Sequence, residues 1–150
     1  VWKNYINERE REYETRIENV YVGKFDGTYH SRVNPVKKKI IHDFVISKKP
    51  SIVIDIGCNR GELSYDLRKY GIKVIGVDIS SREELGIPDD YEFIQMDITR
   101  EDLNLEADII LFLSVYHHLV YNYGLEKADE VFFKLLKNTK SLQLCLITLQ

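Results

Sequence analysis

The stretch Ile52-Val53-Ile54-Asp55-Ile56-Gly57-Cys58-Asn59-Arg60-Gly61-Glu62-Leu63-Ser64 indicates the fold of this chain more clearly than any other. An apolar, β-branched run carries an acid near its end, turns through two glycines and continues into a helix-forming sequence. This order predicts a strand, a tight loop and a helix, with a loop backbone that can approach a ligand closely. A second apolar run, at 73–78, also ends in an acid. Together the two runs indicate the cofactor half of a nucleotide-binding α/β domain.

The rest of the chain alternates between strand and helix patterns. Apolar runs predict strands at 51–56, 73–79, 91–98, 107–114 and 141–149, and amphipathic patterns predict helices at 61–70 and 125–138. Asn34-Pro35 predicts a further helix start, with asparagine as the N-cap and proline in the first turn. Such alternation is typical of a mostly parallel, doubly wound α/β sheet. We expect a helical arm at 1–49 and the sheet domain at 50–150.

Composition excludes several classes of protein. The chain has 150 residues, 44% of them hydrophobic, which suits a single globular domain. Its net charge of −3 gives no electrostatic argument for nucleic-acid binding. No apolar run reaches the roughly 20 residues that span a bilayer, and no signal peptide is recognisable, so a cytoplasmic protein is expected. Cys58 and Cys145 lie far apart and lack metal-ligand spacing, so no metal site is predicted.

The loop after the first predicted strand separates the possible cofactors. The chain lacks the Gly-Lys-Ser/Thr of a phosphate-binding loop, which argues against a simple nucleotide hydrolase. Dinucleotide folds use G-x-G-x-x-G at this place, whereas here Asn59 stands where the middle glycine often lies. Asparagine tolerates left-handed backbone angles better than most residues, so the turn can still form.

The pattern Asp55-x-Gly57-x-x-x-Gly61, followed by an acid that ends the next strand, resembles the class I S-adenosylmethionine-dependent methyltransferases. The resemblance extends from about residue 50 to the end and implies a Rossmann-like fold with S-adenosylmethionine as cofactor. It implies that the glycine loop holds the methionine part, that Asp78 accepts the ribose hydroxyls and that the end of the third strand flanks the adenine. The cofactor-binding residues implied in this way are Asp55, Gly57, Cys58, Asn59, Gly61, Asp78, Ile79, Asp97, Ile98 and Ser114.

Simpler roles stay open for several of these residues. Asp55 can orient the loop or cap the following helix, and Asp78 can be an ordinary turn acid. Asp97 can be a strand-end acid without a ligand. Cys58 is expected to be a small loop residue, because nothing nearby marks it as a nucleophile.

Tyr116-His117-His118, after the fourth predicted strand, supplies the candidate catalytic residues. We expect this segment to be a loop, and at the carboxyl edge of an open α/β sheet such a loop faces the ligand crevice. Methyl transfer needs alignment and, for a hydroxyl acceptor, a base, and histidine is the natural base near neutral pH. We expect Tyr116 to position the acceptor and slightly prefer His117 over His118 as the base. Alternatively, one histidine packs against the following helix.

The segment before the Asn34-Pro35 helix start adds two further candidates. In the resembled family the N-terminal arm often lies across the cofactor, so Arg32 could pair with its carboxylate and Tyr29 could stack or hydrogen-bond nearby. An ordinary surface loop is an equal alternative.

The predicted function is methyl transfer from S-adenosylmethionine to an oxygen or similar acceptor of a small molecule or saccharide. Ser114-Val115-Tyr116-His117 replaces the Asp/Asn-Pro-Pro-aromatic signature of amine methyltransferases that act on nucleic-acid bases, so a nucleic-acid substrate is not expected. Tyr116-His117-His118-Leu119, with the later Gly124-Leu125-Glu126, resembles methyltransferase domains of bacterial surface-polysaccharide or other small-molecule pathways. Two alternatives remain open: a non-catalytic module for partner binding or regulation, and a nicotinamide-dependent oxidoreductase.

The resembled fold usually continues after its fifth strand with a helix and an antiparallel hairpin. Here the sequence stops at Gln150, which would leave an apolar edge at 142–149. Because exposed edge strands invite pairing, we expect either that the chain is part of a longer polypeptide or that a partner covers this edge.

Overall fold

The computed structural model describes residues 35–113, 115–139 and 145–146, and the contacts divide the chain between Phe44 and Val45. Helix α2 (Pro35–Ser47) crosses this division and begins at the predicted proline, while Asn34 lies outside the described residues. The sheet and the helices that follow it belong to the second unit, which is described by itself below. The expected division into an arm at 1–49 and a core at 50–150 stays a prediction.

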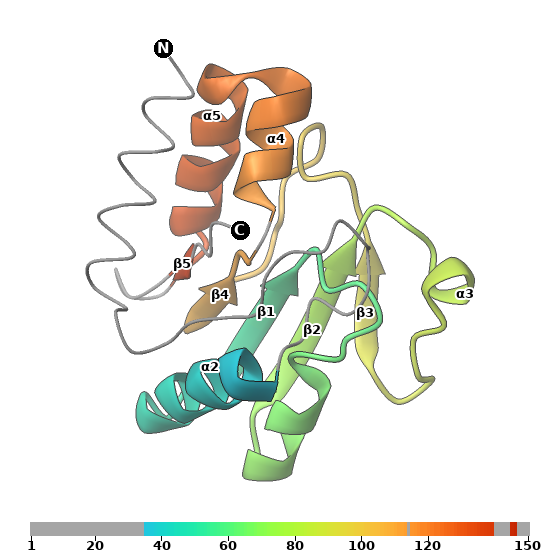
Figure 1. Cartoon of the computed structure of the whole chain (residues 1–150), viewed down its shortest axis with the longest axis vertical. Helices are drawn as coiled ribbons and strands as arrows, with labels where there is room; N and C mark the ends of the chain where they lie inside the picture. Colours follow the sequence, from blue (N-terminus) through green and yellow to red (C-terminus); the bar gives the residue numbers. More distant parts are fainter. Residues whose placement is uncertain (1–34, 114, 140–144, 147–150) are drawn as a thin grey trace. The chain divides into compact units, whose positions relative to one another are not determined.

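The second unit is built on a five-stranded parallel sheet (Figure 1). The order is β3-β2-β1-β4-β5, and every neighbouring pair is parallel, which confirms the predicted sheet. The central strand β1 has four consecutive buried residues, as expected when helices cover both faces. The strands are β1 (Ile52–Ile56), β2 (Lys73–Asp78), β3 (Glu92–Gln95), β4 (Ile109–Leu111) and β5 (Cys145–Leu146).

The order of the strands identifies the edge at which a ligand can bind. From β1 the chain steps outward to β2 and β3, then returns to β4 on the other side of β1 and continues to β5. Because crossovers between parallel strands are right-handed, steps in opposite directions place their connections on opposite faces of the sheet. The order in which strands are added to the sheet reverses between β1 and β4. In open α/β sheets the ligand crevice lies at this point, outside the carboxyl ends of the strands.

The connection between β1 and β2 differs from the prediction. An α-helix was expected at 61–70, but the structure has a short 3-10 helix, η1 (Tyr65–Tyr70), which ends at Gly71 in a left-handed conformation. In a 3-10 helix residues three apart lie one above the other. Tyr65 and Arg68 use this alignment, because the Tyr65 hydroxyl and Arg68 Nη2 both bond Asp90 Oδ2, at 3.0 and 2.9 Å.

The two helices that follow β4 confirm one prediction and correct another. Helix α5 (Leu125–Leu136) lies where a helix was predicted and buries Ala128, Val131 and Leu135. Helix α4 (Tyr116–Tyr123) was not predicted: residues 116–118 were expected in a loop but form the first turn of this helix. Helices α4 and α5 lie side by side (Figure 1). The short helix α3 (Arg82–Leu85) follows β2, with Ser81 as its N-cap.

The strands β3 and β4 are shorter than predicted, because the apolar runs continue into loops. Asp97 forms a turn directly after β3, with its carbonyl accepting from the amides of Arg100 and Glu101. After β4, Phe112 and Leu113 remain buried without ladder bonds, and Phe112 stacks on Phe132 with ring centroids 6.3 Å apart. The apolar run therefore overestimated strand length at both places, and it marked burial at β4 but not at β3, where Phe93 and Ile94 are only half-buried. In the described ranges, every helix is too short or too polar to cross a membrane.

Candidate functional site

The glycine loop after β1 adopts left-handed backbone angles at three of its five residues. The φ values are +67° at Gly57, +52° at Asn59 and +77° at Gly61. The amides of Gly57 and Cys58 both donate to the carbonyl of Val77, at 2.7 and 3.1 Å, which fixes the loop to β2. Asparagine at the middle position thus takes the left-handed conformation expected from the sequence. The loop is a rigid, backbone-lined surface at the carboxyl edge of the sheet.

Asp78 joins this loop to the end of β2. Its Oδ2 accepts from the amide of Asn59 at 3.0 Å, and its Oδ1 accepts from the amide of Ser80 at 3.0 Å. The residue is half-buried, and Ile79 beside it is 62% exposed. Each carboxylate oxygen has two lone pairs, so both can accept one more hydrogen bond from a hydroxyl. The geometry therefore allows Asp78 to orient the loop and bind a diol at once.

Asp55 is placed differently, beneath the loop. Only 3% of the residue is exposed, and its Oδ2 accepts from the Ser64 hydroxyl at 2.6 Å. Ser64 in turn lies 2.8 Å from the hydroxyl of Tyr91, and both residues are fully buried. This arrangement supports the simpler of the two roles considered for Asp55, which is to orient the loop. Direct contact between Asp55 and a cofactor stays a prediction.

Burial also determines the chemistry of Cys58. Removal from water raises the pKa of this thiol well above its ordinary value, and the negative charges of Asp55 and Asp78 raise it further. The thiol lies 3.5 Å from the carbonyl of Asn59, as a weak donor. A protonated, buried thiol is a poor nucleophile. Cys58 is therefore a small packing residue of the loop.

Asp97 lies at the end of β3, near Asp78, because the amide of Met96 donates to the Asp78 carbonyl at 2.8 Å. Its Oδ1 accepts from both the amide and the hydroxyl of Thr99, at 3.0 and 2.6 Å. The hydrogen bond from the Thr99 hydroxyl lowers the pKa of Asp97. These bonds are those of a turn-capping aspartate. They support the strand-end alternative, and an adenine contact stays a prediction.

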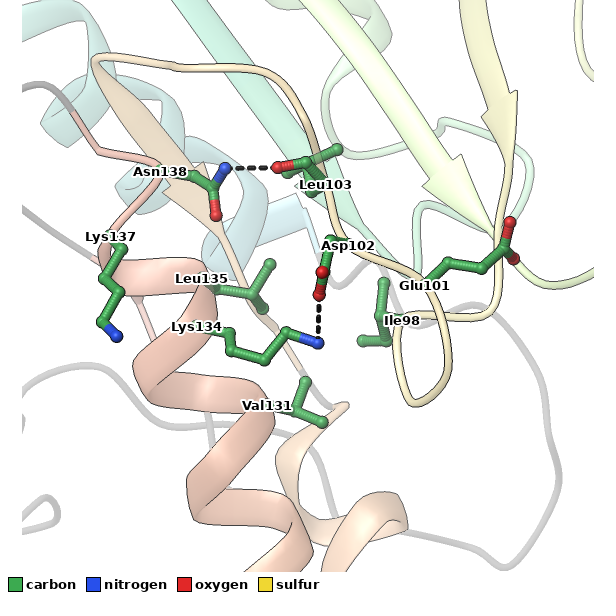
Figure 2. Close-up of a pocket in the computed structure, with 9 residues that line it drawn as sticks. All are labelled: Ile98, Glu101, Asp102, Leu103, Val131, Lys134, Leu135, Lys137 and Asn138. Atoms are coloured by element: carbon green, nitrogen blue, oxygen red, sulfur yellow. Dashed lines mark hydrogen bonds and ion pairs between the residues drawn. The ribbon is translucent and has the colours of Figure 1, made fainter.

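Ile98 points into a pocket away from the glycine loop. This pocket, of about 350 Å³, lies between the segment after β3 and the end of α5 (Figure 2). Lys134 and Asp102 form an ion pair of 2.5 Å beside it, and Figure 2 shows Glu101 pointing away from that pair. Its lining residues are Ile98, Glu101, Asp102, Leu103, Val131, Lys134, Leu135, Lys137 and Asn138. None of them comes from the glycine loop, β2 or α4, so this pocket is not the predicted cofactor site.

The start of α4 lies against the glycine loop. A Cβ atom on Gly57 would come within 2.5 Å of Val115 Cγ2, so the valine covers the Cα atom of that glycine. Tyr116 is buried, and its hydroxyl donates to Asp129 of α5. This contact ties Tyr116 to the packing of α4 on α5. Its predicted part in positioning an acceptor is not supported by this contact and stays a prediction.

The two histidines differ in exposure. His117 is half-buried and His118 is exposed, and their ring centroids lie 4.1 Å apart. Because Val115 contacts the glycine loop, the first turn of α4 lies close to the carboxyl ends of β1 and β4. The structure thus brings the glycine loop, Asp78 and the start of α4 together. Tyr29, Arg32 and Ser114 lie outside the described residues.

Three residues of this edge were missed from the sequence: Ser64, Tyr91 and Val115. A serine one turn into a predicted helix and a tyrosine at the start of a predicted strand are too common to signal a role. Val115 belongs to the segment Ser114-Val115-Tyr116-His117, whose sequence indicates only that the signature of base-specific amine methyltransferases is absent. Its contact with Gly57 depends on the pairing of β4 with β1, which no local pattern reveals.

Comparison with known proteins shows which protein family has this architecture. A family model described as a methyltransferase domain matches residues 29–139, which is most of the chain. Among curated proteins, the chain is 26% identical over 126 residues to the ubiquinone biosynthesis O-methyltransferase of Nitrosococcus oceani (strain ATCC 19707). That match covers 71% of the chain and 52% of the relative, so the chain spans about half the length of that protein.

Solved structures show the same fold. A crystal structure of WbdD with the kinase inhibitor LY294002 matches with a TM-score of 0.57 and 24% identity, covering 72% of this chain and 28% of WbdD. Magnesium protoporphyrin IX methyltransferase from Synechocystis PCC 6803, with bound SAM, matches with a TM-score of 0.54 and 21% identity, covering 84% of this chain and 65% of that enzyme. The Rossmann-like fold and the class I resemblance are thereby confirmed, and the chain belongs to the methyltransferase domain family.

Proposed function

We propose that this chain binds S-adenosylmethionine at the carboxyl edge of the sheet and transfers its methyl group to an oxygen of a small-molecule or saccharide acceptor. The observation that carries the proposal is the Asn59–Asp78 bond, which joins the glycine loop to a carboxylate at the end of β2, beside the point where the strand order reverses. The curated relative is named an O-methyltransferase, which supports oxygen as the acceptor atom. Membership of the methyltransferase domain family argues against the nicotinamide-dependent alternative.

In this proposal the chain mainly supplies alignment and a base. When bound, S-adenosylmethionine supplies a methyl group already activated by its sulfonium. Asp78 accepts the ribose hydroxyls while it keeps the Asn59 amide in place. An imidazole of His117 or His118 takes the proton from the acceptor hydroxyl as the oxygen attacks. The exposure of His118 now favours it over His117, because a base must reach a proton that arrives with an acceptor from solvent.

The cofactor is tested first, by calorimetric titration of the 150-residue chain with S-adenosylmethionine, S-adenosylhomocysteine and NAD. We expect saturable binding of the two adenosyl sulfur compounds and none of NAD. Binding of NAD alone would overturn the proposal. Absence of binding by all three would also overturn it, because the proposal places the cofactor site in this stretch of chain.

The base is tested by replacing both histidines with alanine. The transfer of labelled methyl from S-adenosylmethionine is followed over a panel of phenolic and saccharide hydroxyls. We expect at least a hundredfold loss of rate with cofactor affinity nearly unchanged, as for removal of a general base. Tyr121→Ala, on the same helix and 80% exposed, is the matched control and should keep full rate. Tight cofactor binding without any turnover in the parent chain would instead favour the non-catalytic, partner-binding alternative.

We also infer that residues 1–49 form an N-terminal arm and 50–150 the core, and that Arg32 and Tyr29 contact the cofactor's carboxylate end. The family model begins at residue 29, which supports including this segment in the domain. Arg32→Ala should weaken binding of S-adenosylmethionine but not of adenosine. Equal affinities for both ligands in the variant and the parent would remove Arg32 from the site.

A further inference from the structure

A buried chain of hydroxyl groups lies directly beneath the glycine loop. Ser64 donates to Asp55 Oδ2 at 2.6 Å, and the Tyr91 hydroxyl lies 2.8 Å from Ser64 Oγ. A serine hydroxyl has one proton. Because that proton goes to Asp55, the bond between Tyr91 and Ser64 must use the proton of the tyrosine. The chain therefore runs in one direction, from Tyr91 through Ser64 to Asp55.

The ring of Tyr91 occupies space that two glycines leave open. A Cβ atom on Gly61 would lie 3.2 Å from Tyr91 Cζ, and one on Gly76 would lie 2.6 Å from the Tyr91 hydroxyl oxygen. The same atom on Gly76 would lie 2.8 Å from Cys58 Sγ. The phenol thus passes beside β2 and supports the loop at both Cys58 and Gly61. Tyr91 is fully buried, so its hydroxyl contacts protein and not solvent.

The backbone of Tyr91 is itself fixed. Its amide donates to the carbonyl of Pro88 at 3.0 Å, and its carbonyl accepts from Arg82 Nη2 at 2.8 Å. The other guanidinium nitrogen, Nη1, donates to the same Pro88 carbonyl at 2.7 Å. Burial raises the pKa of Tyr91, with the charge of Asp55 adding to the effect, so the phenol keeps its proton as a donor. A rigid donor under a left-handed loop holds that loop in one conformation.

We propose that Tyr91 is a positioning residue that acts through Ser64 and Asp55 to fix the glycine loop for the methionine end of the cofactor. This inference rests on the proposed function. Nothing in it requires Tyr91 to touch the cofactor, because its contacts are with the buried underside of the loop. It predicts that the hydroxyl matters for the part of the ligand that the loop holds and not for the ribose and adenine.

The test compares Tyr91→Phe with the parent 150-residue chain, using calorimetric titration of S-adenosylmethionine and of adenosine, which lacks the methionine part. We expect S-adenosylmethionine to bind about threefold to tenfold more weakly, the effect of losing one neutral hydrogen bond, with adenosine unchanged. Tyr65→Phe is the matched control, because Tyr65 stacks on Tyr91 but its hydroxyl bonds the exposed Asp90. That control should alter neither affinity.

A second measurement uses the chain without any ligand. Amide hydrogen exchange at Asn59, whose N–H donates to Asp78, should be faster in Tyr91→Phe and unchanged in Tyr65→Phe. If Tyr91→Phe does not fold, Ser64→Ala breaks the same chain and should give the same two effects. The inference would be overturned if the variant lost equal affinity for S-adenosylmethionine and adenosine, or if it lost no affinity and the Asn59 amide exchanged at the parent rate. In either case, binding of S-adenosylmethionine by the parent chain would leave the proposed function standing. A parent chain that binds neither ligand overturns both.

Discussion

Replacing Gly57 with alanine tests the contact that brings the start of α4 to the glycine loop. Two costs act on this substitution. The left-handed angle, φ +67°, disfavours any residue with a Cβ atom by about 1–2 kcal/mol. The new methyl group would also lie 2.5 Å from Val115 Cγ2, and such overpacking costs about 1–3 kcal/mol. We therefore expect Gly57→Ala to reduce the free energy of unfolding by about 2–5 kcal/mol.

Gly86 provides the matched control for this prediction. Its φ of +65° is almost the same, but a Cβ atom there would have no heavy atom within 4 Å. Gly86→Ala should therefore cost only the about 1–2 kcal/mol of backbone strain. Urea denaturation of the parent and of both variants measures the difference, provided that each unfolds in one transition with the same slope.

The same glycine substitutions in a Val115→Ala background isolate the contact. Removing Cγ2 relieves the overlap at Gly57, so the two glycine variants should then differ by less than about 0.5 kcal/mol, the usual error of additivity. Equal losses for Gly57→Ala and Gly86→Ala in the parent chain would refute the reasoning. They would mean that α4 begins farther from the loop than the structure shows.

Three further predictions concern side chains of the site. Asp78→Ala should weaken S-adenosylmethionine binding by about 1.5–3 kcal/mol, as for charge-assisted hydrogen bonds; calorimetry that finds unchanged affinity would mean the ribose site is misplaced. Tyr116→Phe should lower the free energy of unfolding by about 1 kcal/mol, because it removes the bond to Asp129. Methyl transfer should persist in this variant, and a large rate loss at normal cofactor affinity would return Tyr116 to the acceptor site. Because Asp97 has a lowered pKa in the folded chain, its stabilising contribution is complete above the ordinary pKa, about 4, and is lost as pH falls through the folded value. Thr99→Val should raise that pKa and flatten the acid limb of stability; NMR titration of Asp97 measures it, and an unchanged value would contradict the assignment.

The parts of the fold that depend on local pattern could be predicted. The β1 stretch, with its buried run and left-handed turn, is determined by residues next to one another, and the structure matches it. The 3-10 geometry of η1 could not be predicted, because no local pattern separates it from an α-helix and the bonds of Tyr65 and Arg68 go to Asp90, which is remote in sequence. Helix α4 was missed since its first turn carries two histidines, which obscure the apolar positions Leu119 and Val120.

The site shows the same division. Asp78 could be placed because an acid that ends a strand at the carboxyl edge has few alternatives. Asp55 looks equivalent in the sequence, yet it is buried, and its carboxylate accepts from Ser64, which in turn bonds the buried Tyr91. The two acids differ in their neighbours in space: Ser64 follows the glycine loop, and Tyr91 comes from the residue just before β3.

The strand order also sets when the site can form during folding. Every neighbouring pair in the sheet is parallel, so each pairing must wait for a crossover, and Val53 must find Ile109 far along the chain. Pairings between distant residues are slow, since loop closure costs entropy before contacts compensate for it. Val115 can contact Gly57 only after β4 has paired with β1. In a refolding experiment, recovery of ligand binding should therefore coincide with the slowest phase of sheet formation.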